Sequence, residues 1–291
     1  MPINRTLRPQ PPATPETWCY VLILFSSTAI SLTHICQNVS YGSGNFSGKQ
    51  FIDRVALSQN LTIESQSIGA ASHSTGFESG IDGILGIGPV ALTKGTVNDD
   101  EIPTVAGNLF SQGTIANDTV GISFSPWTQD TPNAGEGFLA FGGTDPSRYI
   151  GEIAYTPITQ TSPASNYVGI DASFSYGNEP VLDLNAGIVD SGTTLLLLST
   201  DALKKYLSST GAEVDKITGL PSVTGDQYSK MENLFVSVGE ATYELVPDAQ
   251  RWPGGLNTDI GGNSSSIYLA VGDIGSQSRQ GLDFILGMAF L

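Results

Sequence analysis

From Asn38 onward, the chain alternates short runs of β-branched and aromatic residues with turn-forming residues at nearly regular spacing. Glycine and proline supply 34 and 16 of the 291 residues, a larger share than in an average globular domain, so turns are frequent. The runs include FIDRVAL (51–57), LTIESQSIGAA (61–71), TVGISFS (119–125), GFLAFGG (137–143) and YVGIDASFSYG (167–177). This spacing predicts an antiparallel all-β fold.

Two segments depart from the strand pattern and predict helices. Residues 104–112 carry an apolar stripe that stops at Gly113. Residues 201–209 place Asp201 in a first turn and are followed by Gly211, a residue type that commonly ends helices. We therefore expect two helices within an otherwise β-rich chain.

Length and charge limit the class of protein. A chain of 291 residues has room for two domains or one large all-β unit. A hydrophobic content of 40% indicates a globular protein with a packed core. The formal net charge of −16 argues against nucleic acid as a partner, because such a chain cannot neutralise a phosphate backbone.

Cysteine and histidine are too few to build a site. Cys19 and Cys36 are the only cysteines, so a disulfide framework for the body of the chain is excluded. His34 lies near Cys36 but His73 is distant, which makes a poor zinc constellation. We predict no metal and no cofactor, and we interpret His73 as a histidine of a surface loop.

The N-terminal region contains one apolar stretch. Residues 19–32 form 14 mostly apolar residues, which is short for a membrane span and more typical of the hydrophobic region of a signal peptide. Six Asn-x-Ser/Thr acceptor sequences give moderate support to secretion, at Asn4, Asn38, Asn45, Asn60, Asn117 and Asn263. We expect a secreted protein without a stable membrane span.

The most informative run is AGIVDSGTTLLLL (186–198), in which an apolar strand leads to Asp190 and a second apolar run follows. A carboxylate flanked by apolar strands is costly to bury unless it accepts hydrogen bonds. Ser191, Thr193 and the amide of Gly192 are suited to donate them, and glycine permits the tight turn. The run therefore marks Asp190 as a candidate catalytic carboxylate, whereas a bare Asp-Ser-Gly would be an ordinary turn.

An internal repeat accompanies this run. Residues 82–86 and 283–287 share the pattern Asp-x-Ile-Leu-Gly, 201 residues apart. Five residues are a weak match alone, but the repeat gains meaning beside the Asp190 run.

Together these segments resemble the pepsin-like aspartic endopeptidases, specifically the fungal secreted ones of the polyporopepsin type, over about residues 38–291. IVDSGTTLL is similar to the family's second catalytic loop, with Ser191 in place of the usual Thr. Val39–Gly44 resembles the family's flap hairpin. Residues 80–88, 141–145 and 284–287 resemble further signatures in the family's order.

The resemblance implies an all-β, bilobal fold in which each lobe offers one Asp-Thr-Gly loop and one apolar-apolar-Gly loop. It also implies that the two copies of the Asp-x-Ile-Leu-Gly repeat are the same element in each lobe. It assigns Asp190 to catalysis, with Ser191, Gly192, Thr193 and Thr194 lining the substrate cleft. Tyr41, Gly42, Ser43 and Gly44 would form the flap over the substrate. It implies a secreted monomer that acts on polypeptides through two aspartates and the water between them.

The first of these two aspartates is missing. Residues 1–52 contain no Asp, and Glu16, the acid there, lacks the glycine turn. We expect an atypical segment over 1–37, a partial N-terminal lobe over 38–165, and a C-terminal lobe over 166–291 that is truncated at its end. As written, the chain is expected to be inactive.

Several alternatives remain at this stage. Residues 1–37 can be translated non-coding or frame-shifted sequence that replaces the true leader and first catalytic loop. The chain can instead be an inactive pepsin-like protein that binds peptides or a protein. Two chains can each give Asp190 to one shared site, and a membrane-anchored β-protein using residues 19–32 is the last alternative.

Overall fold

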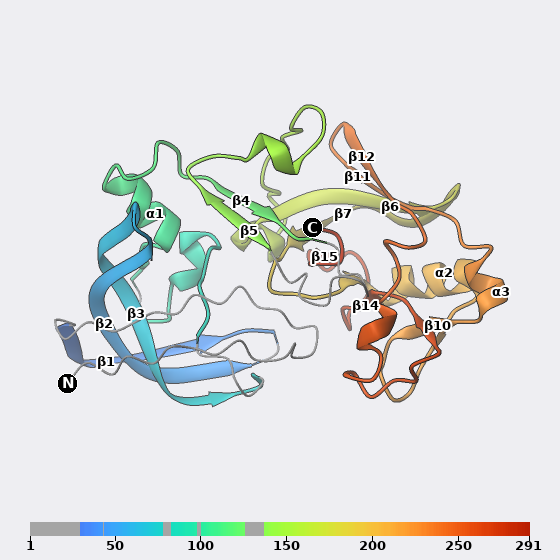
Figure 1. Ribbon diagram of the computed structural model, residues 1–291, viewed down its shortest axis with the longest axis horizontal. Helices are drawn as coiled ribbons and strands as arrows, with labels where there is room; N and C mark the ends of the chain where they lie inside the picture. Colours follow the sequence, from blue (N-terminus) through green and yellow to red (C-terminus); the bar gives the residue numbers. More distant parts are fainter. Residues whose placement is uncertain (1–29, 43, 78–82, 98–99, 126–136) are drawn as a thin grey trace. The chain divides into compact units, whose positions relative to one another are not determined.

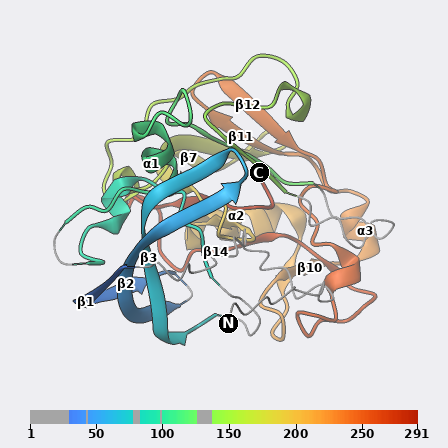
Figure 2. The same ribbon diagram turned by 60° about the vertical axis from the view of Figure 1, so that its left-hand side comes forward.

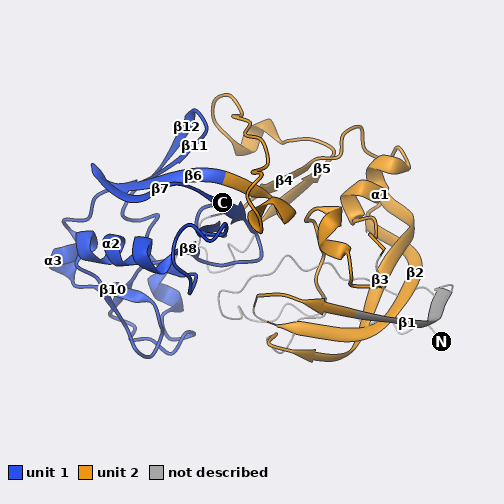
Figure 3. Cartoon of the chain, turned by 180° about the vertical axis from the view of Figure 1, so that it is seen from behind, with its two compact units in different colours: residues 1–17, 124–136, 171–291 blue, residues 18–123, 137–170 orange. Residues whose placement is uncertain are grey.

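A computed structural model describes residues 30–42, 44–77, 83–97, 100–125 and 137–291, and for residues 30–37 it describes the backbone only. The chain divides into two compact units, coloured in Figure 3. Unit 2 contains residues 18–123 and 137–170, and unit 1 contains residues 1–17, 124–136 and 171–291. The boundary between the units at 170/171 lies close to the lobe boundary expected from the sequence, at 165/166. The assignment of these units to the two lobes stays a prediction.

Unit 2 is built on a three-stranded antiparallel sheet in the order β1-β2-β3. Its strands are β1 (Ile30–Ser40), β2 (Asn45–Ser58), β3 (Leu61–Thr75), β4 (Val120–Ser123) and β5 (Phe138–Phe141). Strands β4 and β5 pair with each other as a separate antiparallel ribbon. Figure 1 shows β2 and β3 as one long, curved hairpin. Two of the predicted runs, 51–57 and 61–71, lie inside this hairpin.

Unit 2 contains one α-helix, α1 (Val105–Ser111), and three short 3₁₀ helices among its described residues. The short helices are η1 (Val90–Thr93), η2 (Pro146–Arg148) and η3 (Ala164–Asn166). Figure 2 shows α1 beside the far end of the β2–β3 hairpin. Val105 and Leu109 of α1 pack with Val55, Ile63 and Ile68 of the hairpin in one buried cluster. The helix predicted over 104–112 is therefore confirmed, and burial of its apolar stripe stabilises it.

Unit 1 is built on a seven-stranded sheet in the order β12-β11-β6-β7-β15-β8-β14. Its strands are β6 (Gly169–Tyr176), β7 (Glu179–Val189), β8 (Leu196–Leu198), β11 (Leu234–Val238), β12 (Ala241–Leu245), β14 (Val271–Asp273) and β15 (Phe284–Leu286). A smaller sheet, β13-β10-β9, comprises β9 (Glu213–Val214), β10 (Pro221–Val223) and β13 (Ile267–Tyr268). The helices of unit 1 are α2 (Thr200–Thr210), α3 (Gly225–Tyr228) and η4 (Gly254–Leu256).

Local sequence patterns explain these elements. In β6, Ile170, Ala172, Phe174 and Tyr176 alternate with less buried residues, as expected where one face of a strand packs on a core. Helix α2 ends at Gly211, which adopts the left-handed backbone conformation with φ of 70°. The predicted helix over 201–209 is thus confirmed, with one extra residue at each end.

The sheet pairing differs in part from the antiparallel expectation. Most pairings are antiparallel, but β15 runs parallel to β7, and β14 runs parallel to β8. The physical reason is that β15, from the end of the chain, lies between β7 and β8 and replaces a simple hairpin pairing between them. This insertion positions the loop that carries Asp190.

Candidate active site

Asp190 lies in unit 1, directly after β7, on the loop that leads to β8. Strand β7 is anchored in the core by Ala186 and Ile188, both at most 6% exposed. The loop itself is partly exposed, so the chain passes from buried strand to accessible carboxylate within two residues. A rigid strand end therefore presents the carboxyl group at the surface of unit 1.

Both oxygens of the Asp190 carboxylate accept hydrogen bonds from the loop. Oδ1 accepts from the Gly192 amide at 2.9 Å, and Oδ2 accepts from the Thr193 hydroxyl at 2.7 Å. The Thr193 amide also donates to the Asp190 carbonyl at 3.2 Å and closes the turn. Two of the three donors named from the sequence, Gly192 and Thr193, thus bond to the carboxylate, whereas Ser191, the third, lies in the same loop as Thr194.

Strand β15 holds this loop from the other side. The Asp190 amide donates to the Leu286 carbonyl at 3.0 Å, and the amides of Met288 and Ala289 donate to Thr193 and Thr194 carbonyls at 2.8 and 3.0 Å. A Cβ on Gly287 would lie 2.3 Å from the Thr193 carbonyl oxygen. Only a glycine allows this approach, because no real Cβ tolerates such a distance.

The first copy of the repeat has a different environment. Phe284–Leu286 is a strand with partners on both sides, whereas residues 83–87 form no strand. Gly86 is exposed, and no described atom lies within 4 Å of a Cβ added to it. The expectation that both copies form the same element is therefore wrong for the described residues, because residues 83–87 have no strand to pair with among them.

Three of the predicted flap residues, Tyr41, Gly42 and Gly44, lie at the turn between β1 and β2 in unit 2. The Tyr41 amide donates to the Gly44 carbonyl at 2.7 Å, and Ser43 is outside the described residues, while Gly42 is exposed. The Tyr41 ring meets Phe46 at a centroid distance of 6.5 Å and the edge of Phe77 at 5.7 Å. Partial burial raises the pKa of the Tyr41 phenol above its usual value.

Two other acidic or basic candidates are placed by the structure. His73 is exposed but lies in β3, opposite Ser47 of β2, so its assignment to a loop is wrong. The strand predicted over 61–71 extends to Thr75, and its last five residues are exposed. Asp53, the first aspartate of the sequence, is 5% exposed in the middle of β2 and accepts a hydrogen bond from the Arg54 amide. Glu16 lies outside the described residues.

Within the described residues, no group of three or more His, Cys, Asp or Glu side chains is arranged to hold a metal ion. No described helix has the length and apolar character needed to cross a membrane.

A family model for eukaryotic aspartyl proteases matches residues 23–291. The chain belongs to this family. Among its relatives, polyporopepsin from Irpex lacteus is 53% identical over 258 residues, which cover 87% of this chain and 75% of polyporopepsin. Rhizopuspepsin-1 from Rhizopus niveus is 34% identical over 242 residues, covering 81% of this chain and 59% of that protein.

A solved structure supports the same assignment for the fold of this aspartyl protease. The crystal structure of the aspartic proteinase from Irpex lacteus matches with a TM-score of 0.87 and 49% identity, covering 96% of this chain and 82% of that one. The predicted all-β, pepsin-like fold is thereby confirmed.

The family match extends further toward the N-terminus than the sequence motifs do. The motifs begin at Asn38, but the match begins at residue 23. Strand β1 likewise starts at Ile30 and pairs with β2 on both sides of Asn38, with Cys36 opposite Lys49 and Val39 opposite Phe46. The apolar stretch interpreted as a signal region therefore includes part of a strand of this aspartyl protease.

Sequence reasoning missed two contributors to these sites. Phe77 packs against Tyr41 from beyond the end of β3, and no spacing signal connects these residues. Met288 was not assigned to the site from the sequence, yet its amide donates to the Thr193 carbonyl in the Asp190 loop. Backbone donors leave no trace in a sequence, so only the adjacent Gly287 could have indicated this contact.

Proposed function

We propose that Asp190 is a catalytic carboxylate of an aspartic endopeptidase that hydrolyses peptide bonds in polypeptides. Membership of the aspartyl protease family supports this activity. The observation that carries the role of Asp190 is the pair of hydrogen bonds from Gly192 and Thr193 to its two oxygens. These donors fix the carboxylate at the end of β7 while leaving it partly accessible.

The chemistry requires a second carboxylate. One ionised aspartate removes a proton from a water molecule, the water oxygen bonds to the scissile carbonyl carbon, and a protonated partner donates a hydrogen bond to the carbonyl oxygen. The C–N bond then breaks, and the departing amine takes up a proton. Two carboxyl groups at such a site share one proton because neighbouring like charges resist joint ionisation. The pair of aspartates in pepsin is the standard example.

The described residues offer no second carboxylate with the environment of Asp190. Asp53 is buried in a strand and lacks a glycine turn, and residues 1–52, which precede it, contain no Asp. Gly86, the counterpart of Gly287 in the repeat, is uncovered by described atoms. These observations support the proposal that residues 1–291 alone do not turn over peptides, and that a loop carrying the first aspartate would pack on Gly86.

The flap role of Tyr41, Gly42, Ser43 and Gly44 is a proposal of the same kind. It is supported by the tight turn between β1 and β2 and by the aromatic contacts of Tyr41 with Phe46 and Phe77. Secretion and a monomeric state are also proposed, secretion from the acceptor sequences and from the acidic composition, with a formal net charge of −16.

The test has two parts. The transcript is first sequenced for an in-frame Asp-Thr-Gly-Ser upstream of Asn38. A product that contains it should cleave an unfolded polypeptide at acid pH, and Asp190→Asn should reduce cleavage to background. Asp183→Asn is the matched control, because Asp183 is exposed on the same strand β7. Retained turnover in Asp190→Asn would mean that the wrong carboxylate has been assigned.

A peptide- or protein-binding protein without catalysis is the second candidate, favoured by the absence of an Asp from residues 1–52. A continuous cDNA that encodes residues 1–45 as written, together with binding of a transition-state-mimicking peptide and no cleavage, would select this function. Cleavage by residues 1–291 that this peptide blocks would contradict it.

A further inference from the structure

The tip of the β2–β3 hairpin carries an exposed asparagine. Ser58 pairs with Leu61, so Gln59 and Asn60 form the two-residue connection between the strands, and both are exposed. Asn60, Leu61 and Thr62 form an acceptor sequence for N-linked glycosylation. Its threonine lies in β3 and pairs with Ala56 of β2. The acceptor therefore projects from a rigid hairpin and not from a long loop.

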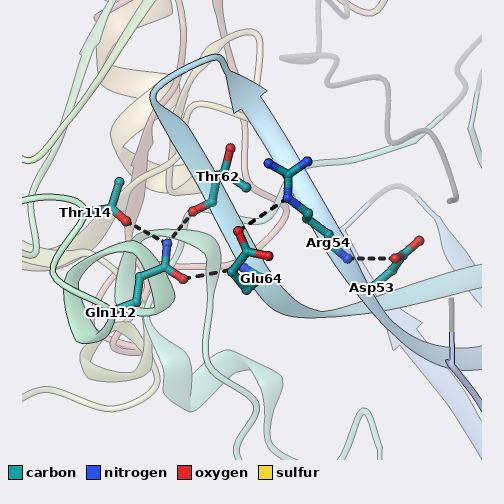
Figure 4. A network of polar contacts seen from close by, with 6 residues as sticks. All are labelled: Asp53, Arg54, Thr62, Glu64, Gln112 and Thr114. Carbon is teal, nitrogen blue, oxygen red and sulfur yellow. Dashed lines mark hydrogen bonds and ion pairs between the residues drawn. The ribbon is translucent and has the colours of Figure 1, made fainter. Parts of the chain in front are cut away.

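Beside this asparagine lies a polar hollow of about 360 Å³. Its lining consists only of polar side chains, from Gln59, Asn60, Thr62, Glu64, Gln112 and Thr114. Gln112 organises it, since its amide nitrogen donates to the Thr62 carbonyl and, at 2.7 Å, to the Thr114 hydroxyl. Figure 4 shows this network, with Arg54 paired to Glu64 at 3.4 Å along the hairpin.

The other acceptor asparagines among the described residues are either hydrogen-bonded or close to the proposed flap. Asn117 donates its side-chain amide to the Gly142 carbonyl at 3.3 Å. Asn263 accepts hydrogen bonds from the amide and hydroxyl of Ser265, the third residue of its own acceptor sequence. Asn38 and Asn45 flank the Tyr41 turn, where an attached glycan would crowd the proposed flap.

We propose that Asn60 carries an N-linked glycan whose innermost N-acetylhexosamine lies in this polar hollow. The hydroxyl and acetamido groups of that sugar match the amide, hydroxyl and carboxylate groups of Gln112, Thr114 and Glu64, whereas an apolar ligand would find no apolar side chain in the lining. The inference rests on the proposed secretion, because the donor of the sugar is found on the secretory route.

The attachment is a group transfer from a lipid-pyrophosphate-linked oligosaccharide. A bond forms between the Asn60 side-chain nitrogen and C1 of the first sugar, and the bond between C1 and the pyrophosphate oxygen breaks. The lipid pyrophosphate leaves, and the amide nitrogen loses one proton to solvent. The remaining amide proton stays available as a donor to the hollow.

The attachment is tested by expressing residues 1–291 behind a secretion leader in a glycosylating yeast and mapping the peptides. Glycans are released enzymatically in heavy-oxygen water, so an occupied asparagine becomes a labelled aspartate. We expect label at Asn60, loss of one glycan in Asn60→Gln and Thr62→Ala, and its retention in Thr62→Ser and in the control Gln59→Ala. An unlabelled Asn60 peptide overturns the proposal, whether or not other acceptors are occupied.

The position of the sugar is tested by thermal unfolding. Trimming the glycan to its first sugar should leave a Tm on the order of 2 °C above that of Asn60→Asp, which has no sugar. Gln112→Ala should abolish this difference, because it removes the group that organises the hollow. Equal Tm values in the parent chain would show that the sugar does not bind there. Neither measurement depends on catalysis, so a failure here is distinct from a failure of the proposed endopeptidase function.

Discussion

Replacement of Gly287 by alanine tests whether the Asp190 loop is held by backbone packing. The added Cβ would lie 2.2 Å from the Leu195 carbonyl oxygen and 2.3 Å from that of Thr193. Ordinary contacts of this kind begin near 3.4 Å, so one of the two backbone segments must move by about 1 Å. Both atoms belong to main chain, and neither can rotate away as a side chain would.

The movement has a calculable cost. It separates the amides of Met288 and Ala289 from their carbonyl acceptors in the Asp190 loop, at present 2.8 and 3.0 Å apart. Each such bond contributes about 0.5–1.5 kcal/mol, and overpacking adds about 1–3 kcal/mol. We expect Gly287→Ala to lower the free energy of unfolding of unit 1 by about 2–6 kcal/mol.

Urea unfolding followed by tryptophan fluorescence measures this change, since Trp252 is 4% exposed in the core of the same unit. Gly225→Ala is the matched control: a Cβ there meets no atom within 4 Å, and Gly225 opens helix α3. It should be neutral or slightly stabilising. If both variants unfold within about 0.5 kcal/mol of the parent, the close packing of β15 on the Asp190 loop does not hold it in place.

Two further predictions concern unit 1. Partial burial opposes the ionisation of Asp201, but hydrogen bonds from the Ser278 hydroxyl and amide outweigh it and lower the pKa from 3.8 to about 2. The stability that these hydrogen bonds supply is therefore present above pH 4 and lost as pH falls toward 2. It is worth roughly 1 kcal/mol after screening by solvent. Asp201→Asn should flatten the pH dependence of the unfolding free energy in urea titrations between pH 4 and pH 2. Tyr206→Phe should cost about 1–3 kcal/mol in the same assay at neutral pH, because the fully buried Tyr206 hydroxyl donates to Gln250 at 2.9 Å and no water can replace it; an unchanged midpoint would contradict that role.

Much of the fold was predictable because its determinants are local. The alternation of Ile170, Ala172, Phe174 and Tyr176 identifies β6 without reference to any other strand. Gly211 marks the end of α2 because it occupies a left-handed conformation that glycine adopts without strain. The donors to Asp190 were predictable for the same reason, since they lie two and three residues away from it.

Non-local contacts were not predictable in this way. The insertion of β15 between β7 and β8 joins segments about a hundred residues apart, and β15 pairs with β7 in parallel where an antiparallel pairing was expected. The contact of Phe77 with Tyr41 and the polar hollow around Gln112 each bring together residues from different elements of unit 2. No spacing in the sequence connects such residues.

The two copies of the Asp-x-Ile-Leu-Gly repeat show what distinguishes a sequence match from a working site. Gly287 is buried because the carbonyl groups of the Asp190 loop close over it. Gly86 has the same neighbours in sequence, yet it is exposed and meets no described atom where a Cβ would lie. Close backbone approach is one reason for a glycine, and among the described residues it applies to Gly287 and not to Gly86. The shared sequence Asp-x-Ile-Leu-Gly therefore does not by itself indicate a shared backbone environment.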